Sequence, residues 1–372
     1  MRILLAGHTA PGGVFTVGSH HLARALAAQG HDVAHLSSPV SALHLARVRD
    51  AEVRRRLRLS LRTHEAAPGV PGVLPFTLLP LSLGPAHTGP LALRTSVPSV
   101  RRRLRPLGMD AVDVLLVDQP LVGGLEELVR ARAVVYRSTD VYEEPARRAG
   151  EARVLRAADG LVATSAFVLE RLRQVRPDLP SLVLDNGVDF ARFAGAPAPA
   201  ERRGLVYVGA VDDRFCWDAL RSVAAAAGDE PVDVYGPVQV AVPDGLPPNV
   251  RLHGQVSYGC TPALLRGARV GLLPFRTTAV NRGRSPMKLF EYLAAGLPVL
   301  STLPPSVSPW PPGVHVLPED GGDVTDLVRD VLAAGVNEAG VEAARSMDWA
   351  DRARTLVEHL GRVLATRPAV PR

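Results

Sequence analysis

The chain has 372 residues, 47% of them hydrophobic and 22% charged, with a formal net charge of +6 at pH 7. That length exceeds what one hydrophobic core usually organises and the composition is not that of a disordered chain, so we expect a globular protein of two domains with an anionic partner. No uncharged apolar stretch reaches the roughly 18 residues of a membrane-spanning helix, and Cys216 and Cys260 lack a metal-like spacing, which together predict a cytoplasmic protein.

The first half of the chain alternates short apolar strands with amphipathic helices. A predicted strand over Arg2–Ala6 is followed by a Gly-rich loop, a helix from about Ser19 to Gln29, and Gly30 where a C-cap glycine belongs. Further strand candidates are "DVAHL", "DVLLVD", "AVVYRS", "GLVATS" and "SLVLDNG". Strands separated by helices in this way predict a parallel sheet with helices on both faces.

An insertion over residues 39–109 interrupts this alternation. Two arginine-rich segments, 46–62 and 100–105, bracket an apolar and proline-rich stretch over 72–93. Three interpretations stay open: a solvated helix face, a nucleic-acid patch, and a contact with an anionic membrane surface. We disfavour nucleic acid as a partner because no aromatic side chains interleave with the arginines to stack on bases. Peripheral membrane contact through 46–105 is carried forward as a hypothesis.

The second half begins after "AGAPAPAERR" (194–203), a small and proline-rich segment typical of a linker. The alternation then restarts with the strand candidates "GLVYVGA", "PVDVYGP", "NVRLHG", "RVGLLPF" and "LPVLST". We predict a first domain over 1–193, a second over 194–349, and a C-terminal helix over 350–372 that packs back on the first. Because ligands of such sheets bind beyond the carboxyl ends of the strands, a cleft between the domains is expected to carry the chemistry.

The chain contains one lysine, Lys288, among its 43 basic residues. Ser285 as a side-chain N-cap, followed by Pro286 at the first helical position, predicts a helix over Met287–Ala295 that Gly296 ends. Lys288 then lies in the first turn, where unpaired N–H groups and the helix dipole favour an anion. An ammonium group at this place fits a phosphate-bearing ligand bound against the helix N-terminus.

Other polar residues accompany the lysine. Glu291 lies three residues later on the same helix face, within reach of hydroxyl groups of such a ligand, and Arg282 and Arg284 precede the helix. The alternative is an ordinary surface pair between Lys288 and Glu291, which contributes little to stability.

These residues stand in segments that resemble GT-B glycosyltransferases. "SPMKLFEYLAAGLPVLST" resembles their donor-binding segment, "LDNGVDFARF" (184–193) the segment that leads into their second domain, and "GLVYVGAVDD" the strand and glycine turn that open it. The N-terminal "PGGVFTVGSHHLARALAAQGHDVAHLSSP" resembles bacterial members. The resemblance implies an α/β protein of GT-B architecture, with two Rossmann-like doubly wound domains facing a cleft. The first domain would bind the acceptor and the second the nucleotide-sugar donor.

The resemblance also implies roles for individual residues. Lys288 would bind the donor diphosphate, Glu291 the ribose hydroxyls, and Phe275 the base, while Gly209 would let the backbone approach the phosphates. Phe275 as a core residue and Gly209 as a turn residue are the alternatives. The full donor-binding set that we predict is Gly209, Phe275, Arg282, Ser285, Met287, Lys288 and Glu291.

One position departs from the pattern of the large retaining family-4 group. Those enzymes carry a second glutamate eight positions before the residue that matches Glu291, where this chain has Gly283. The departure favours an inverting reaction. In this respect the chain is similar to the xanthan glucuronosyltransferase and teichuronic-acid glycosyltransferase types.

An inverting transfer needs a base that removes the proton of the acceptor hydroxyl. We predict Asp140, in "VVYRSTDVYEE", because it follows a strand and resembles the loop that carries the base in the glucuronosyltransferase type. A helix N-cap is the alternative role for Asp140, and Glu143 and Glu144 are the alternative bases.

On the acceptor side, Gly12 and Gly13 are expected to keep the floor of the cleft open, or else to form a tight turn. His20 or its neighbour His21 is expected to contact a sugar. Asp113 and Asp118 are interpreted as strand ends rather than as a metal clamp, so no metal and no cofactor are expected.

The predicted function is transfer of a sugar from a nucleotide-diphosphate donor to a saccharide, a lipid-linked saccharide or a small natural-product scaffold. The pathway would be cell-envelope polysaccharide or secondary-metabolite biosynthesis, with the protein cytoplasmic or peripheral on the inner face of the plasma membrane. A nucleotide-sugar epimerase of the same fold and a non-catalytic membrane-surface protein are the alternatives. A dehydrogenase is excluded because "PGGV" is not the G-x-G-x-x-G dinucleotide fingerprint.

Overall fold

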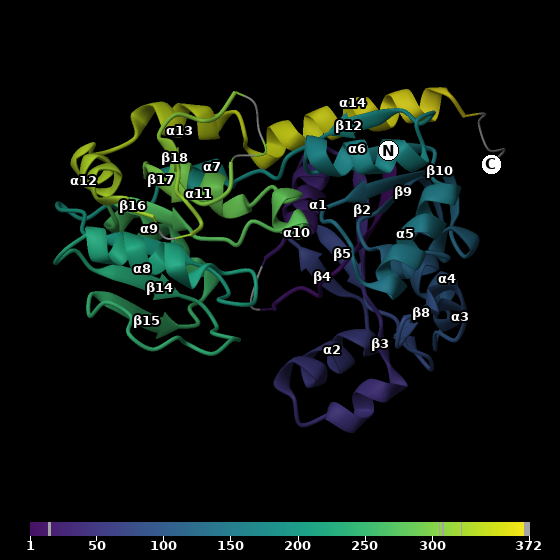
Figure 1. Ribbon diagram of the computed structural model, residues 1–372. Coiled ribbons are helices and arrows are strands. Elements are labelled where there is room, and N and C mark those ends of the chain that lie inside the picture. The colour runs from purple at the N-terminus through teal and green to yellow at the C-terminus, as the bar shows by residue number, and fades with distance from the viewer. Residues whose placement is uncertain (14–15, 305, 307–308, 321, 368–372) are drawn as a thin grey trace. The chain divides into compact units, whose positions relative to one another are not determined.

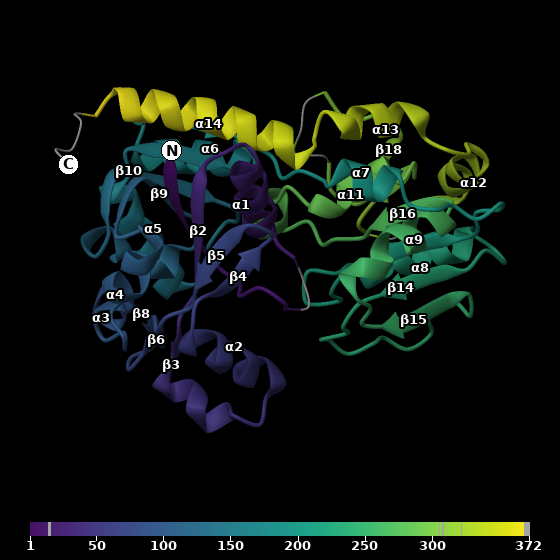
Figure 2. The ribbon, with the colours of Figure 1, turned by 180° about the vertical axis from the view of Figure 1, so that it is seen from behind.

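The computed structural model describes residues 1–13, 16–304, 306, 309–320 and 322–367. The chain forms two compact units, which are shown in Figures 1 and 2. Unit 1 comprises Met1–Asp185 and Ala350–Arg372, and unit 2 comprises Asn186–Trp349. Two residues of the Gly-rich segment, 14–15, and the end of the predicted C-terminal helix segment, 368–372, lie outside the described residues. Within the described parts of the chain, no helix combines the length and the apolar character needed to cross a bilayer.

Unit 1 is built on an eight-stranded sheet in the order β12-β11-β10-β9-β1-β2-β5-β4. Its strands are β1 (Arg2–Gly7), β2 (Asp32–Ser37), β4 (His64–Ala67), β5 (Val70–Val73), β9 (Ala111–Val117), β10 (Arg130–Ser138), β11 (Gly160–Ala163) and β12 (Ser181–Val183). Neighbouring strands are parallel from β12 to β5, so that Leu4 of β1 pairs with Ala34 on one side and Leu115 on the other. The strands predicted from the first half of the sequence are confirmed.

The fully parallel sheet predicted for unit 1 is wrong at one edge. Strands β4 and β5 come from the insertion and are antiparallel, with Ala67 opposite Val70. Only two residues connect them, and Gly69 has a φ of +74°, a conformation that favours glycine. A parallel pair needs a crossover of a dozen residues or more, so this short turn requires a hairpin.

Helices and short strands complete unit 1. The helices are α1 (Gly18–Ala28), α2 (Ala51–Leu61), α3 (Gly89–Arg94), α4 (Val100–Leu104), α5 (Pro145–Ala157), α6 (Ala166–Val175) and α14 (Trp349–Ala365), with 3-10 helices η1 (Ala42–Arg47), η2 (Arg105–Leu107), η3 (Pro120–Val122) and η4 (Leu125–Glu127). The short pairs are β3 (Val40–Ser41) with β6 (Phe76–Thr77) and β7 (Ser82–Leu83) with β8 (Ala86–His87). Helix α14 packs on the start of β11, where a Cβ added to Gly160 would meet the Val363 side chain.

Unit 2 is a six-stranded, fully parallel sheet in the order β15-β14-β13-β16-β17-β18. Its strands are β13 (Leu205–Val208), β14 (Val232–Tyr235), β15 (Val250–Gly254), β16 (Val270–Leu273), β17 (Val299–Ser301) and β18 (Val314–Val316). Its helices are α7 (Phe190–Ala194), α8 (Trp217–Ala226), η5 (Tyr258–Cys260), α9 (Thr261–Gly267), α10 (Ala279–Arg282), α11 (Met287–Ala294), α12 (Thr325–Ala333) and α13 (Glu338–Arg345). The five strands predicted for this half are confirmed, and β18 is additional.

The chain passes between the units earlier than the predicted linker. It changes unit at Asp185 and Asn186, and the segment 194–203 belongs to unit 2. The physical reason lies in the residues just before that segment. The Phe193 side chain is fully buried in a core cluster of unit 2, and the backbone of Val188 exchanges hydrogen bonds with the segment that leads back out of unit 2. These contacts fix residues that the sequence placed in the first domain.

The strand orders locate the ligand-binding edge of each sheet. In an open α/β sheet, ligands bind beyond the carboxyl ends of the strands where the strand order reverses. That point lies between β1 and β9 in unit 1 and between β13 and β16 in unit 2. Residues that follow these strands are therefore the first candidates for a site.

Candidate functional site

The loop before helix α11 contradicts one prediction. Helix α11 begins at Met287, and Pro286 is its N-cap without a side-chain hydrogen bond. Ser285 is not the N-cap, because its hydroxyl accepts a hydrogen bond from the backbone N–H of Asn186 at 3.1 Å. The Asn186 side-chain amide also donates to the Ser285 carbonyl at 2.8 Å. Ser285 thus ties the "LDNG" segment to this loop, and the N-cap provides no side-chain acceptor to the first turn of α11.

Lys288 lies in that first turn and crosses the end of strand β13. A Cβ added to Gly209 would overlap Lys288 Cε, so the glycine leaves room for the lysine stem in this position. Burial lowers the pKa of Lys288 to about 8, against a partial rise caused by the charge of Glu291. The guanidinium groups of Arg284 and Arg214 lower this pKa further. An anion bound near the ammonium group would relieve this repulsion among the three cations.

Glu291 lies on the same helix and is 6% exposed. The Tyr258 hydroxyl donates to Glu291 Oε1 at 3.0 Å, and the guanidinium of Arg192 lies 4.6 Å from the centre of the Tyr258 ring. Burial raises the pKa of the Glu291 carboxyl, and the charge of Lys288 opposes that rise. Tyr258 was missed by the sequence analysis. Its place shortly after a strand end of a parallel sheet is the signal that could have found it.

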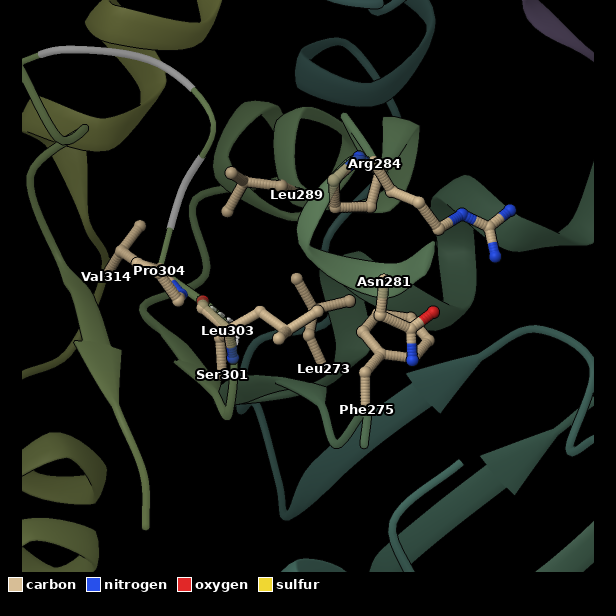
Figure 3. Close-up of a pocket in the computed structure, with 10 residues that line it drawn as sticks. Leu273, Phe275, Asn281, Arg284, Leu289, Ser301, Leu303, Pro304 and Val314 are labelled. Atoms are coloured by element: carbon tan, nitrogen blue, oxygen red, sulfur yellow. Dashed lines mark hydrogen bonds between the residues drawn. The ribbon is translucent and has the colours of Figure 1, made fainter. Parts of the chain in front are cut away.

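A pocket opens beside the N-terminal half of α11, at the ends of β16 and β17 (Figure 3). Its lining residues are Leu273, Phe275, Asn281, Arg284, Pro286, Leu289, Ser301, Leu303, Pro304 and Val314. Figure 3 shows Phe275 and Asn281 among the lining side chains, whereas the Arg284 guanidinium extends away from the apolar part of the lining. Phe275 also packs against both core clusters of unit 2. Its ring makes an edge contact with the Tyr207 ring, with 6.3 Å between the ring centres. It therefore has core contacts and lines a pocket at once.

Arg282 and Met287 are the remaining residues of the predicted donor-binding set. Arg282 is the last residue of α10 and is exposed, and Met287 is half-buried at the first position of α11. Arg284 and Arg214 are the cations whose charge acts on Lys288. Arg214 was missed by the sequence analysis, and it follows the glycine turn after β13, where its Nε donates to Asp212 at 3.0 Å.

A polar cluster stands at the switch point of the unit 1 sheet, at the ends of β1, β9 and β10. The backbone N–H of Leu121 donates to Gln119 Oε1 at 3.2 Å, which turns the Gln119 amide nitrogen toward His8 Nδ1 at 2.8 Å. A neutral His8 then carries its proton on Nε2, 3.4 Å from the Tyr142 hydroxyl. Burial lowers the pKa of His8 to about 4, although the charge of Asp140 raises it. His8 is thus neutral near pH 7.

Asp140 lies beside this cluster. The Thr139 hydroxyl donates to Asp140 Oδ2 at 3.4 Å, and the Ser138 hydroxyl donates to the Asp140 carbonyl at 3.2 Å. Helix α5 has Glu144 as its N-cap, so the alternative role of Asp140 as a helix cap is wrong. Glu143 and Glu144 are exposed, and Glu144 pairs with Arg147 at 3.1 Å. His8, Gln119 and Tyr142 were missed because each comes from a different strand end.

The Gly-rich loop lies at the same edge of unit 1. Gly12 has a φ of +70°, which requires glycine, and Gly13 is exposed next to it. His20 is buried on α1: its Nε2 lies 3.2 Å from the Thr9 carbonyl and its ring 4.8 Å from that of His35. These neighbours describe a packed histidine, so its contact with a sugar stays a prediction.

Asp113 in β9 and Asp118 directly after it take part in ion pairs. Asp113 accepts from Arg132 at 3.2 Å, and Asp118 forms a buried pair with Arg137 at 2.6 Å. Across the described residues, no group of three or more His, Cys, Asp or Glu is arranged to hold a metal ion.

Known proteins resemble this chain in sequence. A family model described as "Glycosyl transferase-like" matches residues 214–366, which include α11. TuaH of Bacillus subtilis, which carries the name of a teichuronic acid biosynthesis glycosyltransferase, is 25% identical over 238 residues, covering 58% of this chain and 59% of that protein. The chain spans about three fifths of the length of the curated relatives it matches.

Solved structures match over nearly the whole chain. Sucrose-phosphate synthase from Thermosynechococcus elongatus has a TM-score of 0.67 at 16% identity, covering 98% of this chain and 100% of that one. AviGT4, described as a glycosyltransferase involved in avilamycin A biosynthesis, has a TM-score of 0.63 at 18% identity, covering 98% of each chain. The chain has the GT-B fold. The resemblance to GT-B glycosyltransferases seen in the sequence is confirmed. Unit 1 and unit 2 are the two Rossmann-like domains of the fold.

Proposed function

We propose that the protein is a glycosyltransferase that moves a sugar from a nucleoside-diphosphate donor to an acceptor hydroxyl, with inversion and without a metal ion. The observation that carries the proposal is the single lysine in the first turn of α11, with Glu291 on the same helix at the switch-point edge of unit 2. The match of 214–366 to a glycosyltransferase-like family supports it.

The donor side would work through fixed positive charge. The N-terminal end of α11 offers backbone N–H groups and the positive end of a helix dipole, and Lys288 adds an ammonium group. Arg214 and Arg284 extend the positive field. Together they would stabilise the negative charge that develops on the diphosphate as it leaves. Glu291, held by Tyr258, would accept hydrogen bonds from the ribose hydroxyls.

The acceptor side would work through Asp140. Its carboxylate would take the acceptor hydroxyl proton while the acceptor oxygen forms a bond to the anomeric carbon and the bond from that carbon to the diphosphate breaks. The absence of a second glutamate at Gly283 supports a single displacement of this kind. A neutral His8, oriented by Gln119, would offer a hydrogen bond to a hydroxyl group without adding a charge.

Two readouts test the proposal together. In a thermal-shift panel of nucleoside diphosphates and nucleotide-sugars, ligands with one particular base should raise the Tm of the protein most. Incubation with the nucleotide-sugar of that base and an acceptor should release the nucleoside diphosphate. An epimerase would convert the donor without releasing the diphosphate, and a non-catalytic protein would leave the donor unchanged. If no nucleotide in the panel stabilises the protein, the proposal is contradicted.

The acceptor and the location belong to the same proposal. A saccharide, a lipid-linked saccharide or a small natural-product scaffold all offer the hydroxyl that the reaction needs. Relatives and structural neighbours named for teichuronic acid and avilamycin biosynthesis support a cell-envelope or secondary-metabolite pathway. We keep the proposal of a cytoplasmic protein that contacts the inner face of the plasma membrane through 46–105.

The Tyr258→Phe substitution tests how Glu291 is positioned. Loss of the hydroxyl removes the hydrogen bond to Glu291 Oε1, so we expect affinity for the preferred nucleoside diphosphate to fall about three- to tenfold. Inorganic pyrophosphate has no ribose, and its affinity should not change. Both are measured by calorimetry, with Tyr235→Phe as the matched control because Tyr235 stacks on His253 at 4.4 Å instead. An equal loss for both ligands would mean a general disturbance of the site.

A further inference from the structure

Helices η1 and α2 form a projecting part of unit 1, which we call the arm and define as residues 42–62. In both Figure 1 and Figure 2, α2 lies beside β3 and away from α14, at the other end of unit 1. The arm lies at the carboxyl-end edge of the unit 1 sheet, because Arg55 donates to the carbonyl of Pro11 in the Gly-rich loop after β1. Its position within unit 1 is therefore next to the predicted acceptor side.

The inner face of the arm is fixed by packing and hydrogen bonds. Leu57 and Leu59 pack against a small cluster of buried apolar residues formed by Ala10, Val40 and Leu74. Arg56 donates to the carbonyls of Ser38 and Pro39 at 2.9 and 3.0 Å. The arm is thus an ordered part of unit 1, and its exposed side chains are not needed for the core.

The exposed side chains of the arm are both apolar and basic. Four of its aliphatic side chains are exposed: Leu43 at 60%, Leu45 at 50%, Val48 at 48% and Leu61 at 82%. Five exposed arginines are interspersed with them, namely Arg47, Arg49, Arg54, Arg58 and Arg62. Single exposed aliphatic residues are common, but four of them interspersed with arginines within residues 42–62 are typical of an interaction surface.

The charge of the arm is one-sided. It holds seven arginines against two carboxylates, so it carries a formal charge of +5 out of +6 for the whole chain. Both carboxylates are already paired, Asp50 with Arg47 at 3.3 Å and Glu52 with Arg55 at 2.5 Å. The arm therefore complements an anionic surface.

We propose that the arm docks on a bilayer that contains anionic lipids. Leucine and valine side chains can enter the boundary between headgroups and acyl chains, while the neighbouring guanidinium groups contact lipid phosphates. Nucleic acid offers the same phosphates but no apolar layer, and the arm has no Phe, Tyr or Trp to stack on bases. This inference rests on the membrane contact proposed above for 46–105, and it locates that contact in the arm and names anionic lipids as the partner.

Co-sedimentation of the full chain with lipid vesicles tests the proposal. We expect partition onto vesicles of phosphatidylcholine with phosphatidylglycerol, decreasing with added salt, and little partition onto phosphatidylcholine alone. Arg49→Gln with Arg58→Gln should lower the partition coefficient by about 25-fold, at about fivefold for each arginine near an anionic surface. Leu43→Ser, Leu45→Ser and Leu61→Ser together should lower it at least about tenfold.

Matched controls remove the same groups elsewhere. Two control variants change exposed residues outside the arm and should partition like the wild type. One combines Arg251→Gln with Arg329→Gln, and the other combines Val175→Ser, Val316→Ser and Val336→Ser. Equal partition of arm variants and controls would overturn the proposal. So would arm-dependent binding of a duplex oligonucleotide without any vesicle binding. Lys288→Met should partition normally, so a failed donor site and a failed docking surface are distinguishable.

Discussion

Replacement of Lys288 by methionine is expected to remove most of the thermal stabilisation that the preferred nucleotide-sugar gives the wild type. The ammonium group lies in the first turn of α11, where it would form a charge-assisted contact with the donor diphosphate. Its loss should weaken binding about ten- to a hundredfold. At a ligand concentration of about 100 times the wild-type Kd, the stabilisation then falls from about 2.7 kcal/mol to between about 1.4 and 0.4 kcal/mol.

The methionine side chain keeps an unbranched stem over Gly209, so the substitution changes charge more than packing. Each shift is measured against the variant's own unliganded Tm, which cancels any change in intrinsic stability. Arg329→Ala removes one exposed positive charge of unit 2, and the nucleotide-sugar should raise the Tm of this variant as much as that of the wild type. If Lys288→Met also shifts like the wild type, the donor-site assignment is wrong.

The same lysine predicts a pH dependence of donor binding. Because the pKa of Lys288 in the free protein is lowered to about 8, the ammonium group loses its proton as the pH rises through that value. Affinity for the fully ionised diphosphate of a nucleotide-sugar should be constant below about pH 7 and then fall by up to about tenfold per pH unit above pH 8. Titration calorimetry from pH 6 to pH 9.5 measures this, and the methionine variant should show no such decline.

Asp140→Asn is expected to lower the turnover number for transfer by about a hundred- to ten-thousandfold, because an amide cannot accept the hydroxyl proton. We expect donor binding to be unchanged, since Asp140 belongs to unit 1 and the residues predicted to bind the donor belong to unit 2. The measurement is acceptor-dependent release of nucleoside diphosphate at saturating donor, with the thermal shift by donor recorded in parallel.

Glu143→Gln and Glu144→Gln are the matched controls for this experiment. Both carboxylates are exposed and lie three and four residues after Asp140, so they report on the loss of a nearby negative charge. Their turnover should stay within about threefold of the wild type, as for other exposed substitutions. A large loss in one of them with normal turnover in Asp140→Asn would move the base to that glutamate.

The sequence predicted the elements of unit 2 better than their ends. The apolar period and Gly296 define α11, but Ser285 looked like its cap and instead binds Asn186, which lies 99 residues earlier. An N-cap preference is a local tendency, and a distant backbone N–H competes for the same hydroxyl. The antiparallel β4–β5 hairpin at the edge of the unit 1 sheet was not predicted either. It lies in a segment where prolines and arginines obscure the alternating pattern of a strand.

Strand and helix periods in the sequence predicted two α/β domains with parallel sheets, because such periods are properties of neighbouring residues. The resemblance of short motifs implied the GT-B fold and, with the position of each residue along the chain, singled out Lys288, Glu291 and Asp140. Only the tertiary structure brought His8 to Gln119 across 111 residues and to Tyr142 across 134, and Tyr258 to Glu291 across 33. In a parallel sheet the carboxyl ends of all strands meet at one edge, whatever their separation along the chain. The contacts made at that edge depend on strand order, which no local pattern encodes.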